Sequence, residues 1–207
     1  MIKTILASSS PRRIEMMKKN GYEPVAIPAD IDETLPFKMS PAASVMYLAL
    51  KKASHVAYPL IEKNDKLTDF VKSQTDCTNT AIIAADTVVV FRNKIIGKPQ
   101  DADEAFSILS ALRNEWHHVI TGVCIYNFKS DGSTAKECFS EDTAVFFSDY
   151  SDEFLRRYVS TDEPYDKAGG YAIQGTFSRF IDHIEGDLDN VIGFPWAAVE
   201  TRLKAAL

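Results

Sequence analysis

The segment from Leu6 to Arg13 combines chemical groups that bind phosphate. It reads Leu6-Ala-Ser-Ser-Ser-Pro-Arg-Arg13 and follows an apolar run. Ser10 is suited to cap a helix, and Pro11 suits the first helical position, where no amide donor is needed. Free backbone amides, the positive end of the helix dipole and the guanidinium groups of Arg12 and Arg13 then meet at one point. This predicts an anion site to which Ser8 and Ser10 add hydroxyl donors. Two solvated surface arginines beside an ordinary cap are the alternative.

An aspartate stands inside a run of β-branched and small apolar residues, Ile82-Ile-Ala-Ala-Asp-Thr-Val-Val-Val90. The run predicts a buried strand, in which Asp86 is unfavourable and costly to bury without a partner. Such local exceptions are often functional, so Asp86 is a candidate catalytic group. An aspartate at a sheet edge or bulge, paired with a lysine or a backbone donor, is the alternative.

Three further segments place polar side chains next to expected strand or helix ends. Asp32-Glu33 offers two carboxylates that suit Mg²⁺ or Mn²⁺, although a solvated acidic loop is commoner. Lys98 lies in a Gly-Lys-Pro turn, and pairing of the preceding short strand is expected to place it near the start of its partner strand, away from Asp86, although its long side chain can still reach the site. The glycines of Asp166–Gly175 allow a backbone to approach a ligand closely. Gln174 can read a base edge or satisfy its own loop.

The elements that position these side chains follow from apolar periodicity, turn residues and capping residues. We expect strands over residues 2–7, 23–28, 81–91, 94–97, 118–128, 136–147 and 178–185. Helices are expected over residues 11–20, 42–56, 102–113, 152–159 and 195–206. The polar stretch 58–79 predicts an inserted loop, with a short helix at 67–71. Early alternation of strands and helices followed by hairpins favours one mixed α/β domain over residues 1–207, a mixed sheet with helices on its faces.

The composition sets the broad class of protein. The chain has 207 residues, of which 45% are apolar and 25% charged, as in globular domains, and a net charge of −6 that argues against nucleic acid as a partner. Three cysteines without C-x-x-C spacing favour free thiols in a reducing compartment, and Cys124 and Cys138 are expected to pack in or beside the core. No stretch predicts a membrane helix or a signal peptide, so a cytoplasmic protein that binds no membrane is expected. Phosphate-loop, dinucleotide and nucleophile-elbow motifs are absent.

Taken together, these segments resemble the Maf family of nucleoside triphosphate pyrophosphatases across nearly the whole chain. Any one of them is weak alone, but all occur in the family's order. The matching segments are Leu6–Arg13, Asp32-Glu33, Leu50-Lys-Lys-Ala53, Ala84–Val89, Gly97–Pro99, His117–Gly122, Asp166–Gly175, Ile184–Gly186 and Asn190–Gly193.

The resemblance implies the Maf/inosine triphosphatase-like fold, with an elongated mixed sheet, and hydrolysis of a nucleoside triphosphate to the monophosphate and pyrophosphate with Mg²⁺ or Mn²⁺. The aspartate that matches Asp86 is the family's proposed proton acceptor. The residues that match Arg13, Thr87 and Gln174 are linked to substrate choice, and this combination resembles the branch that acts on dTTP and UTP. The implied role is house-cleaning of nucleotide pools, with a link to cell-division arrest; a homodimer is a family expectation.

The residues support a mechanistic hypothesis. Glu33 and Asp86 hold the metal directly or through water, and Asp86 as base and Asp86 as ligand remain open alternatives. The cations expected to neutralise the triphosphate are Arg12, Arg13, Lys52 and Lys98, with Ser8 and Ser10 as donors. Alternatives for the whole protein are a pyrophosphatase for 7-methyl-GTP, CTP or modified nucleotides, or a non-catalytic nucleotide-binding regulator of cell division.

Overall fold

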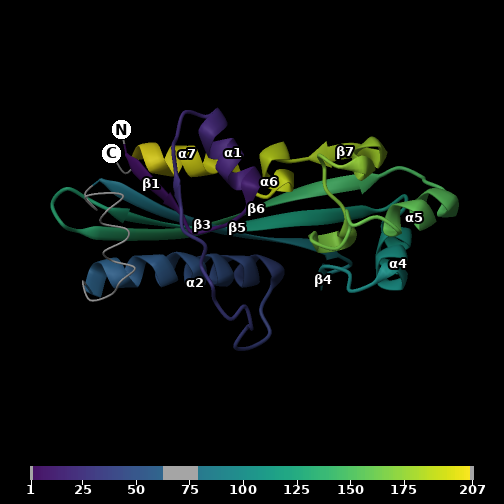
Figure 1. Cartoon of the computed structure of the whole chain (residues 1–207), viewed down its shortest axis with the longest axis horizontal. Helices are drawn as coiled ribbons and strands as arrows, with labels where there is room; N and C mark the ends of the chain where they lie inside the picture. Colours follow the sequence, from purple (N-terminus) through teal and green to yellow (C-terminus); the bar gives the residue numbers. More distant parts are fainter. Residues whose placement is uncertain (1, 63–78, 206–207) are drawn as a thin grey trace.

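The computed structural model describes residues 2–62 and 79–205 (Figure 1). In these ranges seven strands form one mixed sheet in the order β2-β1-β3-β5-β6-β7, with β4 paired to β3. The strands are β1 (Lys3–Leu6), β2 (Val25–Ala26), β3 (Thr80–Phe91), β4 (Lys94–Ile96), β5 (Trp116–Phe128), β6 (Thr134–Phe147) and β7 (Ile181–Glu185). β1 runs parallel to β2 and β3, whereas the other pairs are antiparallel. The expected mixed α/β fold is confirmed, and β3, β5 and β6 give the sheet its elongated shape.

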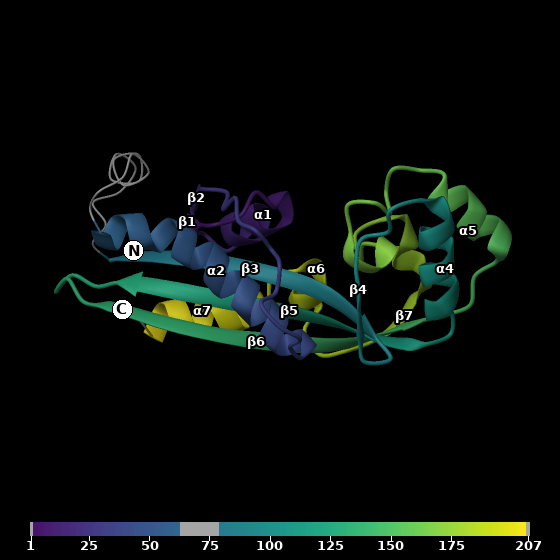
Figure 2. The same ribbon diagram turned by 90° about the horizontal axis from the view of Figure 1, so that it is seen from below.

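The helices lie in two groups along this sheet (Figure 2). The first group contains α1 (Pro11–Lys19), α2 (Pro41–Glu62), α6 (Leu188–Ile192) and α7 (Trp196–Ala205). At the other end of the sheet lie α4 (Ala102–Leu112), α5 (Asp152–Val159) and the short 3₁₀ helices Ala168–Gly170 and Thr176–Phe180. None of the described helices combines the length and apolar character needed to cross a membrane.

The apolar run of β3 is explained by burial on both faces. Ile82 and Ala84 pack under α2, while Ala81, Ile83 and Ala85 pack under α1 and α7. Because successive strand residues point to opposite faces, a strand covered on both sides is apolar at nearly every position. At the far end an aromatic cluster that includes Tyr150, Phe147 and Phe177 joins α4 and α5 to the sheet.

Three expectations about the elements need correction. The helix expected to end at residue 56 continues to Glu62 with Pro59 inside it, because Ala57 and Leu60 extend its buried face. The strand expected over 178–185 begins only at Ile181, since the preceding residues form a 3₁₀ helix that buries Phe177. The short helix α6 was not anticipated. Residues 63–78 of the expected insertion, with its helix at 67–71, and Cys77 lie outside the described residues.

The backbone of α2 touches the sheet at Gly122 of β5. A Cβ atom at Gly122 would lie 2.4 Å from the carbonyl carbon of Val45 and 2.5 Å from the backbone nitrogen of Met46. Gly122 is the register partner of Asp86 on β3. The close approach therefore holds α2 against the part of the sheet that carries the aspartate.

Replacing this glycine tests that contact. We expect Gly122→Ala to lower the free energy of unfolding by about 1–3 kcal/mol, because the new methyl group must displace backbone atoms. Gly97→Ala is the matched control, since Gly97 has open space around its Cβ direction, and a change within about 0.5 kcal/mol is expected there. Urea denaturation measures both; equal stability of the two variants would show that α2 does not need this glycine.

Candidate active site

A cavity of about 590 Å³ lies between the two groups of helices. β1 pairs with β3 only as far as Ile83, and β4 pairs with β3 only from Val89. Between them β3 has an uncovered edge, and Asp86, Thr87 and Val88 are half-buried there although the strand is buried before and after. The cavity occupies this interruption in the sheet.

The cavity brings together nearly all the side chains that the sequence singled out. Those lining it are Ser10, Arg12, Arg13, Glu33, Lys52, Asp86, Thr87, Lys98 and Gln174. Ser8 lies outside the lining, because its hydroxyl is directed at Arg13.

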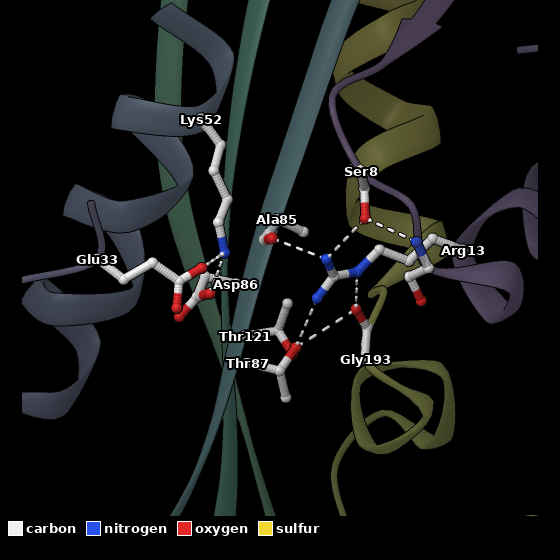
Figure 3. A network of polar contacts seen from close by, with 10 residues as sticks. Ser8, Arg13, Glu33, Lys52, Ala85, Asp86, Thr87, Thr121 and Gly193 are labelled. Atoms are coloured by element: carbon white, nitrogen blue, oxygen red, sulfur yellow. Dashed lines mark hydrogen bonds and ion pairs between the residues drawn. The ribbon is translucent and has the colours of Figure 1, made fainter. Parts of the chain in front are cut away.

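Asp86 and Glu33 share one ammonium group (Figure 3). Lys52 Nζ lies 2.7 Å from Asp86 Oδ1 and 2.7 Å from Glu33 Oε1. The Asp86 and Lys52 side chains are each 14% exposed, while Glu33 is 59% exposed. The structure thus contains both features of the alternative interpretation of Asp86, an uncovered strand edge and a lysine partner. Both of them lie inside the cavity.

Local contacts bring Glu33 to this position. Lys51 Nζ donates to the Asp32 carbonyl and so ties the acidic loop to α2. The Asp32 carboxylate accepts a hydrogen bond from the Thr34 amide at 2.9 Å, and hydrogen bonding by Thr34 lowers the pKa of Asp32. Adjacent lysines on one helix therefore have different tasks: Lys51 anchors the loop and Lys52 meets the carboxylates.

Arg13 completes the uncovered edge of β3. Its Nη1 donates to the Ala85 carbonyl at 2.8 Å and to Ser8 Oγ at 3.3 Å, while Nε donates to the Gly193 carbonyl at 2.9 Å and Nη2 to Thr87 Oγ1 at 3.1 Å (Figure 3). Four of the five guanidinium N–H groups are engaged, which leaves one for a ligand.

Burial and charge act in opposite directions on Arg13. Desolvation lowers its pKa to about 10, and the charge of Asp86 opposes that shift. Arg13 therefore stays protonated at neutral pH, and its charge contributes to the cavity even though most of its donors are occupied.

Thr87 holds Arg13 in place. Its hydroxyl accepts from Arg13, lies 3.0 Å from Thr121 Oγ1 and donates to the Gly193 carbonyl at 3.4 Å. Thr121 donates its own hydroxyl hydrogen to the Asn190 carbonyl at 3.3 Å. The single hydroxyl hydrogen of Thr87 therefore serves both Thr121 Oγ1 and the Gly193 carbonyl. The structure thus places Thr87 against Arg13 instead of leaving its hydroxyl for a base. Thr121 and the Gly193 carbonyl were missed by the sequence analysis, where only their family-matching segments pointed to them.

The expected capping role of Ser10 is wrong. Ser10 occupies the N-cap position of α1, but its side chain makes no capping hydrogen bond. Ser8 Oγ accepts a hydrogen bond from the Ser10 amide at 3.2 Å, so the side chain of Ser8 stabilises the turn before α1. The Ser10 hydroxyl lines the cavity instead.

Lys98 lies closer to the aspartate than expected. Because β4 ends at Ile96 opposite Val89, it stops well short of the start of β3, and Lys98 lines the same cavity as Asp86. Within the described residues Lys98 makes no side-chain hydrogen bond or ion pair, and the same holds for Arg12 and Gln174. These three side chains are therefore available to a ligand, in addition to the remaining N–H group of Arg13 and the Ser10 hydroxyl.

The glycine-rich loop that carries Gln174 is fixed to the sheet at two points. Gly169 N donates to the Gly97 carbonyl at 3.0 Å, and Gly169 has a φ of +72°. His117 Nε2 lies 2.6 Å from the Tyr171 hydroxyl. Burial lowers the pKa of His117 to about 3, so the ring is neutral and its contact with Tyr171 is structural.

Asp166 and Lys167 also line the cavity and were not singled out as site residues. Lys167 Nζ donates to the Glu163 carbonyl at 2.7 Å and pairs with Asp166, and this hydrogen bond lowers the pKa of Asp166. Their only sequence signal was their place at the start of the glycine-rich segment.

The donor set fits a divalent ion that arrives with phosphate. Among the described residues no three His, Cys, Asp or Glu side chains gather as a metal cluster. Glu33 and Asp86 both contact the Lys52 ammonium group, so the two carboxylates lie close enough together to share a cation. Mg²⁺ is often held by one or two carboxylates, with phosphate and water oxygens completing its shell.

Comparison with known proteins agrees with the motifs. The sequence model described as "Maf: Maf-like protein" matches residues 3–206. The chain belongs to the Maf family. A Maf relative from Desulfitobacterium hafniense (strain Y51), named dTTP/UTP pyrophosphatase, is 39% identical over 97% of this chain and 83% of its own length. One from Caldicellulosiruptor bescii with the same name is 43% identical, over 94% of this chain and 90% of its own length.

Solved structures give a more distant likeness to this Maf chain. A HAM1 protein from Coxiella burnetii is 14% identical, covers 99% of this chain and 98% of its own, and has a TM-score of 0.44. Membership of the Maf family rests on the sequence matches alone.

The adjacent arginines provide a matched test of the site. We expect Arg13→Lys to lower the free energy of unfolding by about 1–3 kcal/mol, because one ammonium group cannot satisfy four fixed acceptors. Arg12→Lys, which removes no described contact, should stay within about 0.5 kcal/mol. Urea denaturation of both variants checks this, and a larger loss at Arg12 would contradict the assignment.

Proposed function

We propose that this protein is a nucleoside triphosphate pyrophosphatase that hydrolyses dTTP and UTP to the monophosphate and pyrophosphate, with the whole chain as one Maf-like domain. The observation that carries the proposal is the Asp86–Lys52–Glu33 group at the uncovered edge of β3, beside the unpaired Arg12 and Lys98. The relatives named dTTP/UTP pyrophosphatase support the substrate class. Such an enzyme removes triphosphates from the nucleotide pool.

Charge neutralisation is the first task of the site. Arg12 and Lys98 bind oxygens of the triphosphate, and Lys52 uses its third N–H for the same purpose while two remain on the carboxylates. Fixed donors of this kind act where negative charge develops, which is the main contribution a protein makes to phosphoryl chemistry. Ser10 adds a hydroxyl donor at the start of α1.

Proton transfer is the task of Asp86. Lys52 holds Asp86 Oδ1, so Oδ2 is free to accept a proton from the water that attacks the α-phosphorus. The bond between the α-phosphorus and the bridging oxygen breaks, and pyrophosphate leaves. A Mg²⁺ or Mn²⁺ ion held by Glu33 and Asp86 would neutralise phosphate oxygens and lower the pKa of its bound water.

Gln174 selects the base of the nucleotide. Arg13 and Thr87, which hydrogen-bond to each other, support this part of the cavity. Gln174 is exposed on the cavity wall and its amide has both a donor and an acceptor. A site that hydrogen-bonds a base rejects other bases because they leave its polar groups unpaired.

Pyrophosphate release from a panel of canonical and modified triphosphates, with and without Mg²⁺ or Mn²⁺, tests the activity. We expect release from dTTP and UTP, and for Asp86→Asn a fall in kcat of at least about 100-fold, the scale for loss of a general base. Asp142→Asn, on β6 and outside the cavity lining, is the control. Tight nucleotide binding without release would support a non-catalytic sensor and overturn the proposal.

The role of Gln174 has a separate test. We expect Gln174→Ala to reduce the preference for dTTP over other triphosphates by about tenfold, the scale of one lost hydrogen bond, with a smaller effect on turnover. Gln100→Ala is the comparison, because Gln100 Nε2 donates to the Lys98 carbonyl at 3.0 Å and should affect all triphosphates alike. The measurement is kcat/KM for each nucleotide; an equal loss on every nucleotide in Gln174→Ala would remove Gln174 from base recognition.

A further inference from the structure

Two cysteines face each other across neighbouring strands, on the face of the sheet that α2 covers. Cys124 of β5 is the register partner of Cys138 of β6, and both thiols are free. Directly opposed residues of an antiparallel pair direct their side chains to the same face. Cys124 is buried in the apolar cluster under α2, and Cys138 packs against that cluster.

The backbone hydrogen bonds show which kind of pair this is. Lys129 N donates to the Ser133 carbonyl at the hairpin, and Phe147 N donates to the Glu115 carbonyl at the other end. Hydrogen-bonded and non-hydrogen-bonded pairs alternate along an antiparallel ladder. The hydrogen-bonded pairs of β5 therefore fall on odd-numbered residues, and Cys124 belongs to a non-hydrogen-bonded pair. Such pairs have Cα atoms about 4.5 Å apart, within the range of about 4.4–6.8 Å that a disulfide spans.

The two thiols differ in access and in acidity. β7 pairs with β6 only at residues 144–147, so within the described residues β6 is an edge strand at Cys138. The hydrogen bond from the Cys124 thiol lowers the pKa of Cys138, and the same bond together with burial raises the pKa of Cys124. Cys138 is thus suited to react first and Cys124 to follow.

We propose that Cys124 and Cys138 form a redox modification site in which a low-molecular-weight disulfide such as glutathione disulfide converts the facing thiols into a cross-strand disulfide. The Cys138 thiolate attacks one sulfur of the reagent, forms a mixed disulfide and releases one thiol. The Cys124 thiolate then attacks Cys138 Sγ, forms the Cys124–Cys138 bond and releases the second thiol. Each cysteine loses one proton to a released thiolate, and the reagent takes up the two electrons.

The position of the Cys124–Cys138 disulfide determines which strands it would link. Cys124 is also the register partner of Ala84, two residues before Asp86 on β3. The disulfide would link β5, the strand that pairs with β3 at Ala84, covalently to the edge strand β6, in addition to the backbone ladder. It is independent of the proposed pyrophosphatase activity, because it depends only on these two thiols.

The test uses the full chain with Cys77→Ser, which leaves only the two facing cysteines. The protein is incubated in glutathione redox buffers, free thiols are alkylated, and the intact mass is measured. We expect a product that has lost two hydrogen atoms, carries neither glutathione nor alkyl groups, and returns to the dithiol with dithiothreitol. Peptide mapping should link Cys124 to Cys138.

Two variants in the same background separate the roles of the thiols. Cys124→Ser should stop at a glutathione adduct on Cys138, and Cys138→Ser should form its adduct at least about tenfold more slowly because Cys124 is buried. A Cys77→Ser protein that stays a dithiol, or stops at the adduct, under conditions that modify Cys124→Ser would overturn the proposal. Equal reaction rates of the two serine variants would overturn the assigned order of attack.

Discussion

The sheet is interrupted beside β3. The interruption leaves a buried carboxylate and an unpaired stretch of backbone, and the surrounding elements must stabilise both. Between the end of β1 and the end of β4, β3 has no neighbouring strand on the edge opposite β5, and Asp86 directs a mostly buried carboxylate into the gap. Removing one partner of a buried ion pair costs about 3–5 kcal/mol, so Asp86 requires Lys52. The unpaired backbone requires Arg13, which binds the Ala85 carbonyl.

These two needs explain why the helices lie where they do. Lys52 can reach Asp86 only if α2 lies close to the sheet, and Gly122 permits that approach. Arg13 reaches Ala85 from the first turn of α1, where a cation opposes the helix dipole. Its four acceptors and the nearby charge of Asp86 offset that disadvantage. Arg13 and Lys52 are therefore held by protein groups, whereas Arg12 and Lys98, which are proposed to bind the triphosphate, make no side-chain hydrogen bond or ion pair among the described residues.

Much of this could be predicted from sequence, and the failures have physical causes. The long strands and helices follow from periodicity because burial acts on every residue of the pattern, and Asp86 was found because it breaks the pattern. The position of Lys98 was missed although the expected strand bounds already imply the observed register, because β4 pairs only with Val89, Val90 and Phe91 and so ends far from the start of β3. The Ser10 prediction failed because the N-cap position does not by itself turn a hydroxyl toward the helix amides, and the Gly193 carbonyl has no side-chain signal at all.

The ladder between β3 and β5 continues without a bulge from Thr80 and Phe128 to Val90 and His118, beneath both groups of helices. Domain closure by a hinge would need a break in such a ladder, where a few residues absorb a change in backbone angles. Within the described residues the two groups of helices share this one continuous ladder, which offers no hinge at which they could close over a ligand as separate bodies. Entry of a substrate and departure of its products therefore depend on the loops at the edge of the cavity, the acidic loop at Glu33 and the glycine-rich loop at Gln174, while the β3–β5 ladder keeps its shape through the cycle.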